Sequence, residues 1–104
     1  MNDKARELLV QAYMKGVPQI FGSEANHFGG RCSMGVLKEA LILEKGLAPT
    51  INAIGYFITK IALKDMYEAY ELSVADVSEI ISRNDCNQED FLTIARKACL
   101  PDAQ

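Results

Sequence analysis

The sequence has no apolar run of the length that a membrane-spanning helix needs. Its first residues, Asp3 to Glu7, are mostly charged, and the amino terminus lacks an apolar segment of signal-peptide length. The first absence argues against a transmembrane protein, and the second argues against a secreted one. We therefore expect a cytoplasmic location and no membrane partner.

Metal-binding and disulfide patterns are also missing. The chain has one histidine, His27, and three cysteines, Cys32, Cys86 and Cys99, with no Cys-x-x-Cys pair. An odd number of cysteines is not the pattern of a small secreted domain stapled by disulfides. Zinc ligands usually come in close pairs that share one turn, and none of these four residues forms such a pair. We expect reduced thiols and no metal.

Phosphate-binding signatures are absent as well. Gly29 and Gly30 precede an apolar helix, which is where a phosphate cradle would lie. However, the sequence contains neither the Gly-x-Gly-x-x-Gly spacing nor the Lys-Ser/Thr pair of a Walker motif. The sequence therefore gives no support for nucleotide binding, and we expect no cofactor.

Positive charge is scarce in one part of the chain. Residues 1–64 carry eight Lys or Arg against five acidic residues, whereas residues 65–90 carry one Arg against eight acidic residues. Affinity for nucleic acid comes mainly from cations that meet phosphates. This acidic segment therefore argues against a nucleic-acid partner.

What the chain does contain is an ordinary globular composition: 104 residues, of which 49% are apolar and 24% are charged. This length and composition predict one domain over residues 1–104. Its clearest element is a helix over about residues 32–45, where apolar residues cover more than the single stripe of a surface helix. We expect other elements to wrap this helix, with Gly35 letting a neighbouring backbone come close.

Around this central helix the pattern predicts an all-α fold, a compact bundle of about five helices. A first helix begins at Asn2 or Asp3 and ends at Gly16. Residues 17–31 then form a loop, in which a short strand is the alternative. Residues 51–71 keep a helical apolar period and are interpreted as helix, either one long helix or two with a bend, although residues 54–58 would also suit a strand.

The last third of the sequence predicts two further helices. Ser73, with Asp76 three residues later, has the pattern of a capping box, and Asn84 closes this helix in the left-handed conformation. Asn87 then caps the last helix, which ends before Pro101.

One set of residues has the types that a catalytic site would need. Cys32 lies at the start of the central helix, where the helix dipole and Arg31 would lower the thiol pKa, and His27 lies five residues earlier. With Asp85 or Asn84, these two residues would have the composition of a cysteine hydrolase or transferase site. The alternative, which the sequence favours, is a packed cysteine, a solvent-facing histidine and a turn at Asn84 and Asp85.

The order of several motifs resembles a known set of proteins. The sequence contains Cys32-x-x-Gly35-x-Leu37-x-x-Ala40, then Asn84-Asp85, then Phe91-x-x-Ile94-Ala95. This order is similar to that of small uncharacterised bacterial proteins that have a Cys-Ala-x-Gly-Ala-Leu helix and a later Asn-Asp pair. The sequence has Val36 where that pattern usually has alanine. The resemblance implies that these stretches pack together within one small helical fold, and it implies no activity.

Because no catalytic pattern outweighs its packing explanation, we expect a small non-catalytic domain that binds another protein or itself. Residues 1–64 carry a net charge of +3 and residues 65–90 a net charge of −7, so two chains would complement each other in a symmetric homodimer. The alternative function is a small cysteine-dependent hydrolase or transferase that uses Cys32 with His27.

Overall fold

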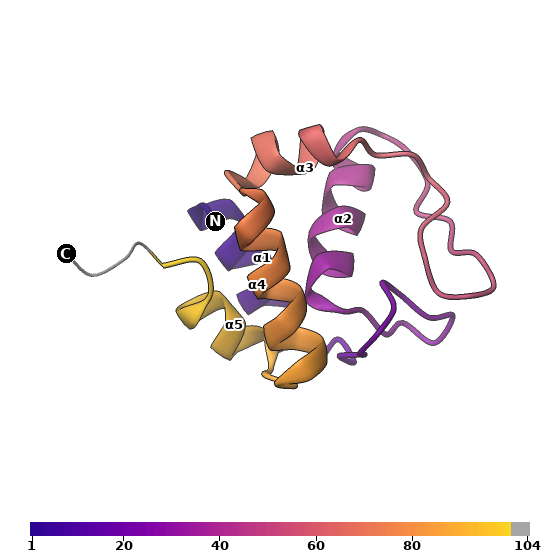
Figure 1. The fold of residues 1–104 in the computed structure, drawn as a ribbon. Coiled ribbons are helices and arrows are strands. Elements are labelled where there is room, and N and C mark those ends of the chain that lie inside the picture. Colours follow the sequence, from indigo (N-terminus) through magenta and orange to yellow (C-terminus); the bar gives the residue numbers. More distant parts are fainter. Residues whose placement is uncertain (101–104) are drawn as a thin grey trace.

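The computed structural model describes residues 1–100 and shows a bundle of short helices (Figure 1). Within these residues there are five α-helices and one π-helical turn, and the β-type pairing consists of isolated bridges. No helix in the described part of the chain is long and apolar enough to cross a membrane. The all-α class predicted from the sequence is confirmed. In chain order the elements are α1 (Asp3–Met14), α2 (Ser33–Glu44), α3 (Leu63–Tyr70), α4 (Val74–Ile81), the π-helical turn η1 (Ser82–Cys86) and α5 (Phe91–Lys97).

Helix α2 lies between two cores. On one side, Leu37 and Leu41 belong to the main core, which contains buried residues of α1, α3, α4 and α5. On the other side, Ile42 packs with Ala25 and Phe57 from the two long loops and forms a small second core. Figure 1 shows this arrangement, with α1, α4 and α5 on one side of α2 and the loops on the other. The predicted central helix is therefore confirmed, and each of its ends agrees with the observed end to within one residue.

Several predicted helix ends are also confirmed. The side-chain oxygen of Asn2 accepts a hydrogen bond from the Ala5 N–H at 3.0 Å and so caps α1. Ser73 and Asp76 form the full capping box at the start of α4, because each side chain accepts a hydrogen bond from the backbone of the other. These local signals are fixed by residues close in sequence, which is why the sequence pattern reveals them.

The predicted helix over residues 51–71 is wrong for its first half. Residues 51–62 form an irregular loop, and helix begins only at Leu63. The Asn52 side chain accepts hydrogen bonds from the backbone N–H groups of Ile54 and Tyr56, and this local turn competes with helix formation. Gly55, at φ +92°, then takes a conformation outside the helical region.

The predicted boundary between the last two helices is wrong as well. Asn84 does not close α4 in the left-handed conformation, because it lies inside η1, which continues the helix with a wider turn. The cap of α5 is Asp90, whose side chain accepts a hydrogen bond from the Thr93 N–H at 2.7 Å, rather than Asn87. Helix α5 ends at Lys97, and Pro101, the predicted stop, lies outside the described residues.

Candidate functional site

Two long loops lie against the second core: the first loop, residues 15–32, and the second loop, residues 45–62. The strand alternative for the first loop is reduced to isolated bridges, in which Arg31 faces Gln19 and Ala25. The loop end is held by a hydrogen bond from the Cys32 N–H to the Glu24 carbonyl at 3.1 Å. The first loop therefore folds back on itself just before α2 begins.

Gly35 makes the close approach between this loop and α2 feasible. A Cβ atom on Gly35 would lie 1.9 Å from the Glu24 carbonyl oxygen, a distance that no side chain tolerates. Gly35 is helical and buried, so a neighbouring backbone, and not a left-handed turn, requires the glycine. The sequence prediction that Gly35 lets a neighbouring backbone come close is confirmed.

Each loop contains a turn of the same construction, which we call an Asn turn. In the first, residues 26–30, the Asn26 side-chain oxygen accepts hydrogen bonds from the N–H groups of Phe28 and Gly30, at 2.9 and 2.8 Å. In the second, residues 52–56, the Asn52 side-chain oxygen accepts hydrogen bonds from the N–H groups of Ile54 and Tyr56, at 3.1 and 2.9 Å. In both turns the asparagine N–H donates to the carbonyl four residues later, at 3.0 and 2.8 Å.

The two Asn turns also share their sequence pattern. Each reads Asn-x-apolar-Gly, and the glycine has a positive φ, +85° at Gly29 and +92° at Gly55. The apolar residue points away from the protein: Phe28 is 92% exposed and Ile54 is 74% exposed. Because the asparagine ties the turn at several points, the backbone that carries each exposed side chain is fixed.

Hydrogen bonds join the two loops directly. The Gly55 carbonyl accepts from the N–H groups of Glu24 and Ala25, at 2.8 and 3.1 Å. The Tyr56 hydroxyl donates to the Gly22 carbonyl at 3.2 Å. A Cβ atom on Gly55 would lie 2.9 Å from the Ala25 oxygen, so glycine is required here for its contact as well as for its φ. The loops thus form one surface unit.

Asn84 connects this unit to the helical bundle. Its side-chain oxygen accepts hydrogen bonds from the Ser33 N–H, the Ser33 hydroxyl and the Gln19 amide, at 3.0, 2.8 and 2.8 Å. Its amide nitrogen donates to the Ile20 carbonyl at 3.0 Å and to the Asp85 carboxylate at 2.7 Å. The side chain is buried, and every hydrogen-bonding position on it is used. The cysteine-containing helix and the Asn-Asp pair, the two motifs of the resemblance, are therefore in contact through Ser33.

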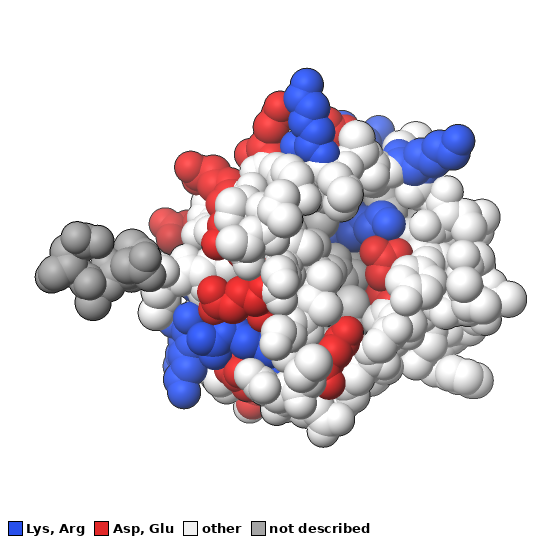
Figure 2. All heavy atoms as spheres, viewed as in Figure 1, with Lys and Arg blue, Asp and Glu red and all other residues white. Residues whose placement is uncertain are grey.

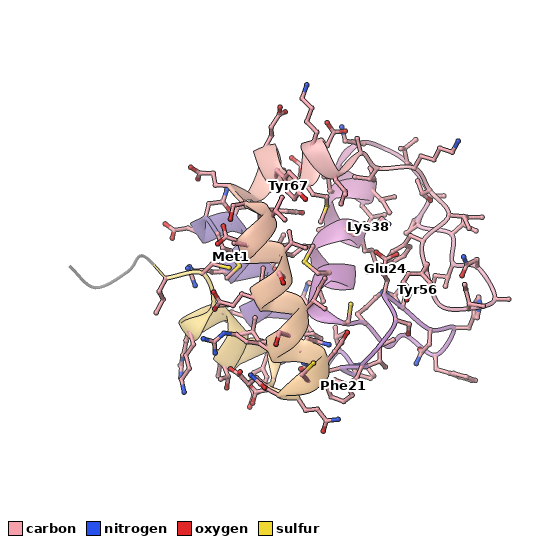
Figure 3. The ribbon with its side chains drawn as sticks, viewed as in Figure 1. Met1, Phe21, Glu24, Lys38, Tyr56 and Tyr67 are labelled. Carbon is pink, nitrogen blue, oxygen red and sulfur yellow. The ribbon has the colours of Figure 1, made fainter. Side chains whose placement is uncertain are left out.

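A cavity of about 220 Å³ lies where the loops, the start of α2 and the end of α4 meet. Its lining includes Glu24, Cys32, Met34, Tyr56, Ile81 and Asp85. In Figure 3, Lys38, Glu24 and Tyr56 lie close together on the loop side of α2. Asp85 is held at the cavity by the Gly22 N–H, which donates to its carboxylate at 3.1 Å.

Cys32 is a buried, protonated thiol in this cavity wall. Burial raises its pKa from its ordinary value near 9 to about 11, and the nearby carboxylates of Asp85 and Glu24 act in the same direction. The Gly35 N–H, which donates to the sulfur at 3.3 Å, opposes the shift without overcoming it. The prediction that the helix start lowers the thiol pKa is wrong, because desolvation outweighs the backbone hydrogen bonds that the first turn of α2 supplies.

The three candidate catalytic residues are not assembled into one site. Cys32 and Asp85 line the same cavity, whereas His27 is exposed in the first Asn turn and does not line it. In residues 1–100 the His27 side chain has no hydrogen-bond partner. This geometry gives no support to a cysteine hydrolase or transferase. The same residues contain no group of three His, Cys, Asp or Glu placed to hold a metal, and the three cysteines are free thiols.

A second cavity, of about 160 Å³, lies between α1 and α2. Arg31 and Glu39 line it and form an ion pair at 2.7 Å, with Arg31 also lying 5.5 Å above the Phe57 ring. Because the charges of Arg31 and Glu39 already satisfy each other, this ion pair offers no free charge that would select a ligand.

No protein-family model, curated protein or solved structure matches this chain.

Sequence reasoning missed the buried hydrogen-bonding role of Asn84 and the two Asn turns. Asparagine is common in turns, and the partners that show the role of Asn84, Ser33, Gln19 and Ile20, lie more than 50 residues away in sequence. The Asn turns did leave a signal in the sequence, since Asn-x-apolar-Gly occurs at residues 26–29 and again at residues 52–55.

Proposed function

We propose that this chain is a small non-catalytic protein–protein interaction domain, and that it binds a partner protein through the surface of its two loops. The observation that carries the proposal is the pair of Asn turns, each of which holds a large apolar side chain, Phe28 or Ile54, out in solvent. Exposed apolar residues are common on protein surfaces. Packing does not explain why Phe28 and Ile54 both lie exposed on rigid turns of the same design, in loops that are hydrogen-bonded to each other.

Rigid presentation matters because binding requires side chains and loops to be ordered. A loop that is already fixed loses less conformational entropy on binding than a mobile loop, so more of the contact energy appears as affinity. Large apolar side chains that fill pockets of a partner supply most of the energy in many interfaces. Phe28 and Ile54 therefore have the properties of interface anchors.

The surroundings of the anchors fit a protein partner. Figure 2 shows that the loop side of the molecule is largely without charged side chains in this view, whereas the helical side carries many. Phe21, Tyr56 and Ile58 of the two loops are also partly or largely exposed. Depletion of charge with exposed aromatic and aliphatic residues is the composition of an interface centre.

A second copy of the chain is the alternative partner. The sequence suggests that opposite charges attract two chains, but charges of the two segments also pair within one chain, as Lys45 with Asp65 at 3.5 Å shows. Exposed pairs of this kind contribute only about 0–1 kcal/mol. The charge asymmetry therefore supports a homodimer less strongly than the loop surface supports a different partner.

The experiment is a selection followed by mapping. A phage-displayed library of random linear peptides is selected against the folded protein, and an enriched peptide is titrated into 15N-labelled protein. We expect the largest amide shift changes in residues 20–30 and 52–58. The proposal is contradicted if no peptide is enriched, or if the shift changes fall on α3 and α5 instead.

Sedimentation equilibrium of the protein alone distinguishes the two kinds of partner. A single species at the mass of one chain, 11.5 kDa, supports a partner other than itself. A dimer whose interface amides include those of Phe28 and Ile54 contradicts the proposal of a different partner, because the loop surface would then be occupied by a second copy.

A further inference from the structure

We propose that the cavity beside the loops accepts a lysine or arginine side chain from the partner protein, with Asp85 as its counter-charge. This inference rests on the proposed function, because it names the chemistry of the segment that the loop surface binds. Three features of the cavity support it: a carboxylate that has no cation as its partner, an apolar wall, and a volume that fits one long side chain.

The charges of the cavity are unequal. Of its two carboxylates, Glu24 is paired with Lys38 at 3.2 Å and also accepts a hydrogen bond from the Phe57 N–H. Asp85 forms no ion pair with any cation in residues 1–100. One of its oxygens accepts hydrogen bonds from Gly22 and Asn84, which leaves the other for a ligand. The cavity therefore has a net negative charge that a cation would neutralise.

The position of Asp85 is fixed before any ligand arrives. Asn84, its neighbour in η1, is fully hydrogen-bonded and buried, and it donates directly to the Asp85 carboxylate. π-Helical turns are rare and occur often at functional sites, because the wider turn changes the direction of the side chains on it. Here the turn directs Asn84 into the bundle and places Asp85 at the cavity.

The walls suit the stem of a basic side chain. Met34, Tyr56 and Ile81 supply apolar surface against which the methylene groups of lysine or arginine can pack. The Tyr56 ring is held by the hydrogen bond from its hydroxyl to Gly22, the residue that also contacts Asp85. The Cys32 thiol is neutral at physiological pH, so it neither attracts nor repels the cation.

The size of the cavity suits one long side chain. Pockets for drug-sized molecules and cofactors measure roughly 300–1,000 Å³. At about 220 Å³, this cavity is smaller than such pockets and is large enough for a single long side chain. It is also continuous with the anchors, because Tyr56 belongs to the same Asn turn as Ile54. One extended segment of a partner can thus contact Ile54 and insert a basic residue nearby.

The test uses peptides enriched from the random library and their binding to the folded protein. We expect the enriched sequences to share a lysine or arginine. Replacing that residue by its neutral analogue, norleucine or citrulline, should weaken the dissociation constant about tenfold for the unchanged protein. The same replacement should have little effect on binding to Asp85→Asn, because the charge partner is already gone.

Asp85→Asn keeps a side-chain oxygen for the hydrogen bonds from Gly22 and Asn84. The variant therefore loses the negative charge and should still fold. Glu68→Gln is the matched control, since it removes one negative charge from an exposed position on α3 that does not line the cavity. The control should bind the peptides as the unchanged protein does.

The outcomes separate the two proposals. Peptides that bind the loop surface equally well with norleucine or citrulline contradict the basic subsite and leave the interaction function standing. An equal loss for both proteins also contradicts the subsite, because Asp85 would then not be the partner of the charge. If no peptide is enriched at all, the interaction function itself fails.

Discussion

The side-chain oxygen of Asn84 accepts hydrogen bonds from both the backbone N–H and the hydroxyl of Ser33, a residue 51 positions earlier in the chain. This contact joins the π-helical turn to the first turn of α2. Because Asn84 also holds Gln19 and Ile20, it fixes the first loop against the same helix. The loop surface therefore depends on one buried amide.

Asn84→Ala should lower the free energy of unfolding by about 2–3 kcal/mol. The substitution removes the acceptor of the buried Ser33 N–H and hydroxyl, and each buried donor left unpaired costs about 1–3 kcal/mol. Chemical denaturation measures the loss. Asn87→Ala, at an exposed asparagine three residues later, is the control and should change stability by less than about 0.5 kcal/mol. Equal effects at the two positions would contradict the role assigned to Asn84.

Gly35→Ala should destabilise the protein by about 2 kcal/mol or more, although alanine is the better helix former by about 1 kcal/mol. The reason is the Glu24 carbonyl, which lies where the new Cβ would go. Gly46→Ala serves as the comparison, because Gly46 has open space around it and only a positive φ of 75°. A stabilised Gly35→Ala variant would show that the loop does not pack on α2 at this point.

Leu37→Ala and Leu41→Ala should each cost about 2–5 kcal/mol of stability, the range for truncating a leucine in a core. Both residues lie in the main core, whereas Leu43, on the same helix, is 57% exposed. Leu43→Ala is therefore the matched control, with an expected loss below about 1 kcal/mol. Losses under about 1 kcal/mol at both core positions would mean that α2 is peripheral.

Cys32 should be alkylated far more slowly than Cys86 at neutral pH. Only the thiolate reacts, and burial raises the Cys32 pKa to about 11, whereas Cys86 is exposed and serves as the internal control. Because the raised pKa favours the protonated form, the Cys32 rate should increase as the pH rises from 9 towards 11. Mass spectrometry of the labelled protein measures both rates. Fast labelling of Cys32 that His27→Ala abolishes would instead revive the cysteine-enzyme hypothesis.

The central helix was predictable because its evidence is local. The sequence of α2 places apolar residues on more than one face of the helix. Such a helix has to be covered on several sides, whatever the rest of the chain does. Gly35 was predictable for the same reason, since a glycine inside a buried helix indicates a close neighbour. The identity of that neighbour, the Glu24 carbonyl, was not predictable, because the loop that carries it has no periodic pattern.

The second loop was mispredicted because two signals competed. The spacing of Ile51, Ile54 and Ile58 fits a helix, yet Ile54 and Ile58 are largely exposed in the structure. The turn at Asn52 and the backbone contacts of Gly55 with the first loop determine the conformation instead. The contacts of Gly55 are long-range, so apolar periodicity alone could not reveal them.

The binding affinity of loop-tip variants tests the central claim most directly. The dissociation constant of an enriched peptide is measured for Phe28→Ala/Ile54→Ala and for Met14→Ala/Val74→Ala. The second variant truncates two side chains of similar exposure, 75% and 71%, on α1 and α4. The account predicts a loss of about tenfold or more for the loop variant, with both variants as stable as the unchanged protein. Equal affinities for the two variants would contradict the proposal that the Asn turns carry the interaction anchors.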